Sequence, residues 1–312
     1  MLPTGLSMLW EPCDPGPALH ERFGFDGVDA AADWLSAALA GTWGTTVHAC
    51  PRLVISDRNV IAWATSDRGD LVVKWSCDTG RFARLDTSTR LLRDLARQGI
   101  PVAAPLATRD GDDRVVLPGP LGELSVAVLP ELTGDWLDVD DLAAVRSAGS
   151  WLARVHAAFP PPTDGAATPL HERVEAWLRS ADPGFVPAAS TRLATLLATA
   201  PPLSERPQYV HDDFRAANLL TRDSEVVGVL DFDEVRVDHR VGDLAKASVY
   251  LATRFTDWGP TSPPVRTALR AGYEAVRPLS PEEARWLEVL VLWQGVMAVR
   301  GPGDAAGWAL GL

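Results

Sequence analysis

Three polar side chains stand near the ends of two short apolar segments in the second half of the chain. Asp213 and Asn218 are five residues apart, just before the apolar segment Leu219–Thr221. Asp231 directly follows the apolar segment Val226–Leu230. Both segments have the composition of strands with a turn between them, so we predict a hairpin. A hairpin brings its two outer ends together, and the three side chains should therefore converge.

Two carboxylates and an amide oxygen form a set of hard ligands suited to Mg²⁺. This ion keeps several of its waters and binds the phosphates of a substrate. Phosphoryl transfer needs little else from a protein: metal ions on the phosphates, a carboxylate to orient the attacking hydroxyl, and a cation on the transferred group. The sequence therefore predicts chemistry on a magnesium-bound triphosphate.

The same segment carries a three-part motif: HDDFRAAN at residues 211–218, LDF at 230–232 and GDLA at 242–245. It resembles the pattern H-x-D-x-x-x-x-N, then an aspartate followed by an aromatic residue, then D-L-A. That pattern is typical of the aminoglycoside phosphotransferase, type II homoserine kinase and choline kinase group, which are small-molecule relatives of the protein kinases. The three pieces in this order are specific, whereas any one of them is weak. The resemblance covers roughly residues 45 to 300.

The resemblance implies a two-lobed α+β fold of the protein-kinase type, with ATP and Mg²⁺ as cofactors and an alcohol group of a small molecule as acceptor. By the same resemblance, Asp213 would be the catalytic base, and Asn218 and Asp231 would be the metal ligands. Asp243 would brace the catalytic loop from a buried position. We expect His211 to be a structural hydrogen-bonding residue of the loop rather than an acid or base.

The nucleotide site is predicted from the first half of the chain. Lys74 lies in an apolar strand and is one of only two lysines, against 27 arginines. An unpaired lysine there would be unfavourable, and Lys74 matches the family's strand lysine that grips the α- and β-phosphates. Val128–Leu132 matches the hinge whose backbone binds adenine. Because Pro130 has no N–H, we expect its carbonyl and the Leu132 amide to make those bonds.

Two residues beside Asp213 are unusual. The family usually has glycine immediately before the catalytic aspartate, and this chain has Asp212. An exposed loop acid and a contact to a cationic substrate are equally compatible with that residue. Arg215 lies two residues after Asp213, where protein kinases carry a lysine. We hypothesise that Arg215 neutralises charge on the phosphoryl group during transfer.

The nucleotide-binding segments also depart from the family pattern. The loop SDRN at residues 56–59 contains no glycine, so fewer backbone amides can hold the phosphates. Ser56 and Arg58 are candidates to help. The helix predicted at residues 81–98 offers Lys74 no glutamate, and Asp86 is the nearest acidic candidate.

The acceptor site has several candidate residues and no single motif. Asp233, Arg236 and Asp238 follow the motif aspartate, and Tyr273 and Trp293 lie on later helices. The acidic charge and the family resemblance favour a cationic, aminoglycoside-like antibiotic. A homoserine- or choline-like metabolic kinase and a nucleotide-binding pseudokinase are the alternatives, the latter because the loop glycines and the helix glutamate are missing. A metal-dependent phosphohydrolase is disfavoured, since such sites usually need more histidines on helices.

The elements that must position these residues follow from hydrophobic periodicity and from turn residues. Strands are predicted at residues 52–55, 60–65, 71–75, 102–106, 114–117 and 124–129, besides the hairpin. Helices are predicted at residues 27–40, 81–98, 142–159, 171–179, 189–198, 244–255, 264–276 and 281–299. His156 lies on the helix predicted at residues 142–159, with Leu152 and Val155, and is expected to contribute to packing. We predict an N-terminal helical extension (1–45), a β-rich nucleotide-binding lobe (46–130) and a helical lobe with the catalytic loop and acceptor site (131–312).

The composition and charge of the chain exclude several classes of protein and partner. The chain has 312 residues, of which 46% are hydrophobic and 22% charged, as in soluble globular proteins. A net charge of −12 argues against a nucleic-acid partner. No apolar run approaches the roughly 18 residues of a membrane span, and Met1–Asp14 lacks the features of a signal peptide. Three scattered cysteines indicate neither disulfides nor a zinc site, so we expect a cytoplasmic protein.

Overall fold

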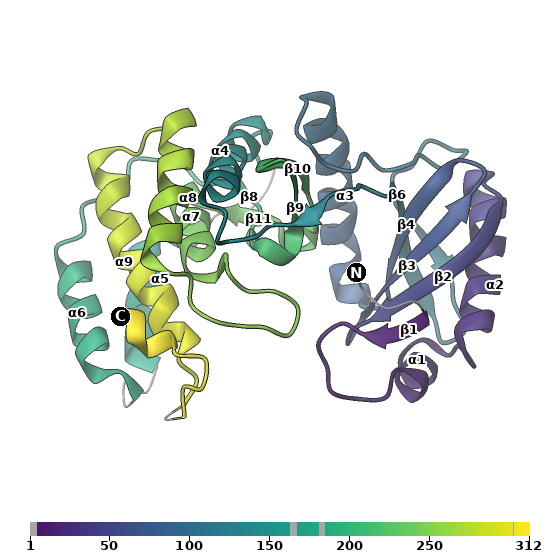
Figure 1. Cartoon of the computed structure of the whole chain (residues 1–312), viewed down its shortest axis with the longest axis horizontal. Coiled ribbons are helices and arrows are strands. Elements are labelled where there is room, and N and C mark those ends of the chain that lie inside the picture. Colours follow the sequence, from purple (N-terminus) through teal and green to yellow (C-terminus); the bar gives the residue numbers. More distant parts are fainter. Residues whose placement is uncertain (1–4, 163–166, 181–184, 302) are drawn as a thin grey trace. The chain divides into compact units, whose positions relative to one another are not determined.

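The computed structural model of the chain describes residues 5–162, 167–180, 185–301 and 303–312. The chain forms two compact units, which meet in sequence between Leu132 and Thr133 (Figure 1). Residues 1–4 of the predicted N-terminal extension lie outside the described residues.

The first unit is built on a six-stranded sheet with the strand order β1-β2-β3-β4-β6-β5. The pairing of β1 with β2 is parallel, and every other neighbouring pair is antiparallel. The turn compositions after residues 55 and 66 explain the meander from β2 to β4. The strands are β1 (Gly5–Met8), β2 (Val47–Ile55), β3 (Asn59–Ser66), β4 (Gly69–Ser76), β5 (Val115–Pro118) and β6 (Glu123–Pro130).

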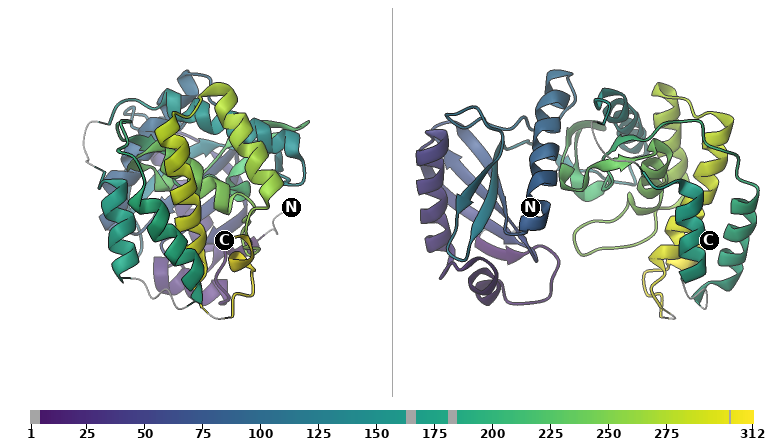
Figure 2. Two further views of the ribbon diagram at one scale, coloured as in Figure 1. Left: turned by 90° about the vertical axis from the view of Figure 1, so that its left-hand side faces the viewer. Right: turned by 180° about the vertical axis from the view of Figure 1, so that it is seen from behind.

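Helices α2 and α3 lie on opposite faces of this sheet (Figures 1 and 2). Alternation along β4 explains which side chains face which helix. Leu71, Val73 and Trp75 are almost fully buried in one core with α1 and α2. Successive side chains of a strand point to opposite faces, so Lys74 lies on the face opposite α2. The helical elements of this unit are α1 (Pro15–Phe23), α2 (Val28–Ala38), η1 (Leu39–Trp43), η2 (Thr79–Arg81) and α3 (Phe82–Arg97).

The strand predicted at residues 102–106 is absent, which corrects the sequence analysis. The segment approaches β6, where the Leu106 N–H donates to the Val128 carbonyl at 2.8 Å. Pro101 and Pro105 have no N–H to donate, so a regular ladder cannot extend through this segment. At the N-terminus, the strand β1 was not predicted, and α1 lies in the predicted helical extension, where only the helix at residues 27–40 was located from the sequence.

The second unit contains two small sheets that hold the polar motif. One has the strand order β10-β9-β7 and the other pairs β11 with β8. The predicted hairpin forms from β9 and β10, with Leu219 opposite Val229 and a bulge between Val226 and Gly228. The strands are β7 (Asp135–Trp136), β8 (Gln208–Val210), β9 (Leu219–Arg222), β10 (Glu225–Val229) and β11 (Arg236–Asp238).

Helices make up the rest of the second unit. Helices α4 and α8 cross closely because both carry glycine at the contact: a Cβ on Gly149 would lie 2.0 Å from the Leu269 carbonyl oxygen. A Cβ on Gly272 would lie 1.9 Å from the Arg146 carbonyl oxygen. The helical elements are α4 (Leu142–Ala158), α5 (Leu170–Ser180), α6 (Pro187–Ala198), η4 (Ala216–Asn218), η5 (Phe232–Glu234), α7 (Arg240–Tyr250), α8 (Pro263–Val276), α9 (Pro281–Ala298) and η6 (Trp308–Gly311). Within the described ranges, none of the helices has the length and apolar character needed to cross a membrane.

Candidate active site

The loop between β8 and β9 brings Asp213 and Asn218 into direct contact. The Asn218 side-chain amide donates to the Asp213 carboxylate at 2.7 Å and to the Asp213 main-chain carbonyl at 2.8 Å. The short helix η4 produces this contact, because its turn folds the chain back within five residues. Asn218 is 6% exposed, so the contact is largely shielded from water.

Asp231 reaches the same place from the other end of the hairpin. The N–H of Leu230, the preceding residue, donates to the Asn218 carbonyl at 2.8 Å. Asp231 itself has a left-handed backbone, with φ of 60°. That conformation is uncommon for residues other than glycine, although aspartate is among those that tolerate it best. The structure thus brings together Asp213, Asn218 and Asp231, as the hairpin predicts.

The charge environment of Asp213 favours a protonatable carboxylate. Burial raises the pKa of Asp213, and the nearby negative charge of Asp231 raises it further. The positive charge of Arg215 opposes both effects. A carboxylate with a raised pKa holds a transferred proton better than an ordinary exposed aspartate does.

Arg215 is fixed beside this carboxylate but has donor capacity left. Its Nε lies 3.1 Å from both carboxylate oxygens of Asp213. Its guanidinium carbon lies 5.4 Å from the centre of the Trp258 ring, within the range of a cation–π interaction. One terminal nitrogen of Arg215 is buried and has no hydrogen-bond partner among the described residues. A buried guanidinium N–H without a protein partner is suited to an oxygen of an incoming phosphate.

His211 uses both ring nitrogens inside the loop. Its Nδ1 accepts from the Asp213 N–H at 3.2 Å, and its Nε2 lies 3.0 Å from the Leu230 carbonyl oxygen. The tautomer with hydrogen on Nε2 satisfies both bonds, so neither nitrogen is left for proton transfer. In this geometry both ring nitrogens of His211 bond to the backbone of the motif.

Asp243 accepts hydrogen bonds from the backbone of the loop. Its two carboxylate oxygens accept from the N–H groups of His211 and Asp212, each at 2.9 Å. His156 Nε2 lies 2.8 Å from the same carboxylate, and Tyr273 is bonded to the other side of that ring at 2.9 Å. Full burial acts to raise the pKa of Asp243, but the hydrogen bonds from His156 and the backbone outweigh it and the pKa is lowered.

The role of His156 in holding Asp243 was therefore missed in the sequence analysis. Sequence reasoning expected it to contribute only to packing, whereas it holds the buried brace of the loop. Its partner Asp243 is 87 residues away in sequence, and no local pattern links the two.

The donor set fits Mg²⁺ on the chemistry of its residues. Because the Asp213 carboxylate needs a donor, the amide nitrogen of Asn218 faces it, which leaves the amide oxygen to turn toward a cation. Asp231 supplies a carboxylate oxygen at the same end of the hairpin. Among the described residues, no group of three or more His, Cys, Asp or Glu side chains could hold a metal ion. One carboxylate and one amide suit a magnesium ion that also binds phosphates and water.

The predicted nucleotide residues all lie in the first unit. Lys74 is half-buried on β4, opposite Ala127 of β6. Ser56 and Arg58 lie in the turn between β2 and β3, which is closed by the bond from the Ser56 N–H to the Asn59 carbonyl at 2.9 Å. The Arg58 carbonyl accepts from the Ser76 hydroxyl at 3.1 Å, which ties this turn to the end of β4.

The hinge candidates Pro130 and Leu132 lie at the end of the first unit, and Asp86 lies on α3. Pro130 ends β6, and Leu132 is the last residue of the first unit. The Glu131 N–H between them donates to the Asp70 carbonyl at 2.9 Å. Asp86 lies 3.0 Å from Arg90 one turn further along α3.

The acceptor candidates occupy different environments. Arg236 and Asp238 are paired with each other at 2.8 Å, and Asp238 is only 2% exposed. Asp233 is half-buried in η5. Tyr273 is fully buried and Trp293 is 8% exposed.

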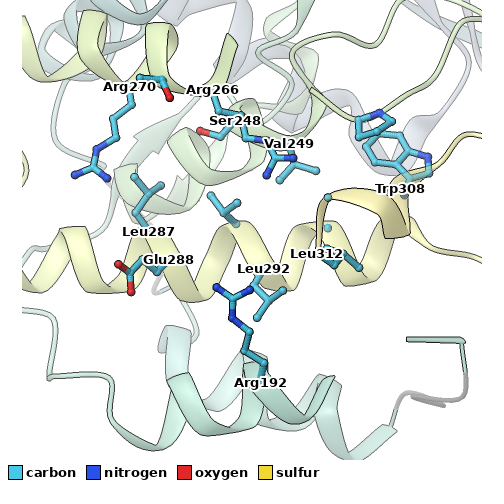
Figure 3. A pocket seen from close by; sticks show the side chains of 15 residues that line it. Arg192, Ser248, Val249, Arg266, Arg270, Leu287, Glu288, Leu292, Trp308 and Leu312 are labelled. Carbon is cyan, nitrogen blue, oxygen red and sulfur yellow. The ribbon is translucent and has the colours of Figure 1, made fainter. Parts of the chain in front are cut away.

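A separate cavity of about 340 Å³ lies in the second unit between α6, α8, α9 and η6 (Figure 3). Its lining combines apolar side chains of α9 with Arg192, Arg266 and Arg270. No residue of the catalytic loop at 211–218 lines this cavity. The cavity is therefore distinct from the cluster around Asp213.

A model of the phosphotransferase enzyme family matches residues 54–287 of the chain. Among curated proteins, the homoserine kinases of Phenylobacterium zucineum and Rhizobium etli are each 30% identical, over 208 and 210 residues. Each alignment covers 64% of this chain, and 62% and 63% of the respective relative. The chain thus spans less than two thirds of the length of these relatives.

Several solved structures share the fold. A macrolide 2′-phosphotransferase from Brachybacterium faecium superposes with a TM-score of 0.59 at 16% identity, covering 89% of this chain and 97% of that one. A microcompartment-associated aminopropanol kinase gives 0.59 at 16% identity, covering 90% and 94%. An amicoumacin kinase, solved with AMP-PNP and Ca²⁺, gives 0.58 at 16% identity and covers 91% of each chain. The predicted α+β fold of the kinase type is confirmed.

Proposed function

The chain belongs to the phosphotransferase enzyme family, and we propose on this premise that it transfers the γ-phosphoryl group of ATP to a hydroxyl group of a small molecule. The observation that carries the proposal is the Asp213 carboxylate, held in a buried loop by Asn218 at 2.7 Å and by Arg215 at 3.1 Å. Such a carboxylate has a fixed orientation and a raised pKa, which are the two properties a general base requires.

In the proposed reaction, the acceptor hydroxyl gives its proton to a carboxylate oxygen of Asp213. The hydroxyl oxygen forms a bond to the γ-phosphorus, the bond from that phosphorus to the β–γ bridging oxygen breaks, and ADP leaves with the electron pair. Asn218 and Arg215 keep the carboxylate oriented throughout, because each donates a hydrogen bond to it. Positioning and charge stabilisation supply most of the catalysis in reactions of this class.

Asn218 and Asp231 are the residues that would hold Mg²⁺. When bound, this ion supplies positive charge on the phosphate oxygens and orients the triphosphate. The buried donor of Arg215 that lacks a protein partner would bind an oxygen of the transferred phosphoryl group. Asp243 and His211 support the loop and do not take part in proton transfer.

For the nucleotide, we assign Lys74 to the α- and β-phosphates. Its half-buried position on β4 would place a compact ammonium in a partly desolvated environment, where its attraction to phosphate is strengthened. Ser56 and Arg58, in the turn before β3, would contact the phosphates, and the Pro130 carbonyl and Leu132 amide would bind adenine.

Two acceptor classes remain in competition, each with its own support. A cationic, aminoglycoside-like antibiotic is favoured by the net charge of −12 and by the acidic Asp233 and Glu234 that follow Asp231. Homoserine is favoured by the curated relatives, which are named homoserine kinases. In the first case the Asp233 carboxylate would contact a cationic group of the acceptor.

A coupled assay of ADP release tests the proposal. Purified protein is given Mg²⁺-ATP and a panel of aminoglycosides, macrolides, peptide and nucleoside antibiotics, homoserine, choline and amino alcohols. We expect acceptor-dependent ADP release with one class, and mass spectrometry should show one added phosphoryl group on that acceptor. Nucleotide binding with no turnover on any acceptor would instead identify a nucleotide-binding pseudokinase.

A further inference from the structure

Lys246 on α7 is the second of the two lysines in this arginine-rich chain, and the reaction described above does not use it. Its ammonium donates to the main-chain carbonyl of Asp212 and lies 3.1 Å from the Asp212 carboxylate. Both contacts are to the residue immediately before the proposed base, Asp213.

Asp212 has a left-handed backbone conformation, which glycine adopts without strain and aspartate adopts at some cost. Its φ is 60°, in the left-handed region, where a side chain is disfavoured. Its side chain is also largely buried, with 9% of the residue exposed. Burial raises the pKa of Asp212, and the positive charges of Lys246 and Arg236 oppose this effect. An aspartate that is both buried and left-handed requires compensating interactions.

The contacts of Asp212 supply that compensation at three points. Its N–H donates to Asp243 at 2.9 Å, and its carbonyl accepts from Lys246. Its carboxylate lies between Lys246 and Arg236, with Arg236 at 3.0 Å. Because both the N–H and the carbonyl are bonded, the peptide planes on either side of Asp212 are fixed. The second of these planes carries Asp213.

The ion pairs continue away from the loop. Arg236 also lies 2.8 Å from Asp238, and Asp238 lies 2.6 Å from Arg173 on α5. Charges therefore alternate from Lys246 through Asp212, Arg236 and Asp238 to Arg173. This chain of ion pairs ties the catalytic loop to α7, β11 and α5 at once.

We propose that Lys246 and Asp212 form a positioning pair that replaces the conformational freedom of glycine and fixes the orientation of the Asp213 carboxylate. The kinetic consequence rests on the proposed function, whereas the structural consequence does not. A lysine suits this place better than an arginine, because a compact ammonium can donate to a carbonyl and a carboxylate of one residue. Lys246 acts through Asp212 and does not touch the substrate.

A double-mutant comparison tests the pair: it asks whether Asp212→Gly restores or further lowers the kcat of Lys246→Met. Lys246→Met leaves a buried, strained Asp212 without its main counter-charge, so we expect kcat to fall about 10- to 100-fold, as for a misplaced catalytic group. Asp212→Gly accepts a left-handed backbone without strain, so its kcat should stay within about threefold of the wild type. The double variant Asp212→Gly/Lys246→Met then has neither strain nor an unpaired carboxylate. Its kcat should exceed that of Lys246→Met at least threefold, with an unchanged KM for ATP throughout.

Independent effects of the two residues predict the opposite result, a double variant slower than either single variant, and that result would overturn the proposal. Lys246→Arg should restore only part of the activity, and full activity in that variant would contradict the argument for an ammonium. Arg285→Met is the matched control, since Arg285 forms an exposed ion pair with Glu288 at 2.7 Å. It should leave kcat unchanged.

A second readout does not depend on turnover. Hydrogen–deuterium exchange of residues 208–218 should become faster in Lys246→Met and return toward the wild-type rate in the double variant. Unchanged exchange in Lys246→Met would refute the pair even if no acceptor is found. Conversely, absence of activity in the wild type with this exchange pattern intact would refute the proposed function and leave the pair standing. Thermal unfolding of each variant shows that the compared proteins are folded.

Discussion

Asn218 donates through one side-chain nitrogen to both the carboxylate and the main-chain carbonyl of Asp213, at 2.7 and 2.8 Å. The two acceptors belong to one residue, so the bond pair fixes both the position of the loop and the rotation of the carboxylate. The amide oxygen of the same side chain is the predicted ligand of Mg²⁺. Asn218 thus joins the proposed base to the proposed metal site.

Asn218→Ala should therefore damage two functions at once. We expect kcat to fall about 100-fold or more, because a catalytic group loses its orientation. The Mg²⁺ concentration for half-maximal activity should rise in the same variant, because one of two protein ligands is gone. A titration of activity with Mg²⁺ measures both quantities. A fall in kcat with an unchanged Mg²⁺ requirement would remove Asn218 from the metal site.

Arg215→Ala tests the cation beside the proposed base, and it should shift the pH dependence of the rate in a known direction. The positive charge of Arg215 lowers the pKa of Asp213 against the effects of burial and of Asp231. Without Arg215, that pKa should rise, so the acidic limb of the pH–rate profile should move to higher pH. The plateau kcat should also fall about 10²- to 10³-fold if Arg215 stabilises the phosphoryl group. An unchanged plateau would disprove that role, even if the limb moves.

His156→Phe should lower stability rather than affect substrate binding. The change leaves the buried Asp243 without its side-chain donor, which we expect to lower the free energy of unfolding by about 2 to 4 kcal/mol. Asp243 has a lowered pKa when folded, so its hydrogen bonds stabilise the protein above the ordinary aspartate pKa, and this stability is lost as the pH falls through the folded pKa. Urea unfolding of the two proteins should therefore differ more at pH 7 than in acid. An equal difference at both pH values would contradict the account.

Lys74→Met should weaken nucleotide binding and leave the second unit intact. We expect the KM for ATP to rise about tenfold or more, because one charge-assisted contact to phosphate is lost. Calorimetry with a non-hydrolysable ATP analogue measures the same loss without turnover. Unchanged affinity in that experiment would exclude Lys74 from the nucleotide site.

The catalytic hairpin could be predicted from the sequence because its information is local. Two apolar segments, the turn between them and the polar residues at their ends specify the contacts of Asp213 and Asn218 within twenty residues. Helices with clear periodicity, such as α8 and α9, were also predicted to within one residue at each end.

The remaining features depend on contacts distant in sequence. The bond between His156 and Asp243 and the pair of Lys246 with Asp212 join residues 87 and 34 positions apart. Lysine is rare in this chain, but no local pattern linked Lys246 to Asp212. The segment 102–106 looked like a strand because its composition is apolar, but Pro101 just before it and Pro105 within it have no N–H to donate to a ladder.

The most direct test of the account is the phosphoryl-transfer rate of Asp213→Asn under saturating Mg²⁺-ATP and acceptor. Asparagine keeps the shape of the side chain and cannot take the proton, so kcat should fall about 10²- to 10⁴-fold while ATP affinity stays unchanged. Asp223→Asn is the control, since Asp223 lies exposed in the turn of the same hairpin and should keep full activity. Near-normal turnover in Asp213→Asn would contradict the assignment of Asp213 as the base.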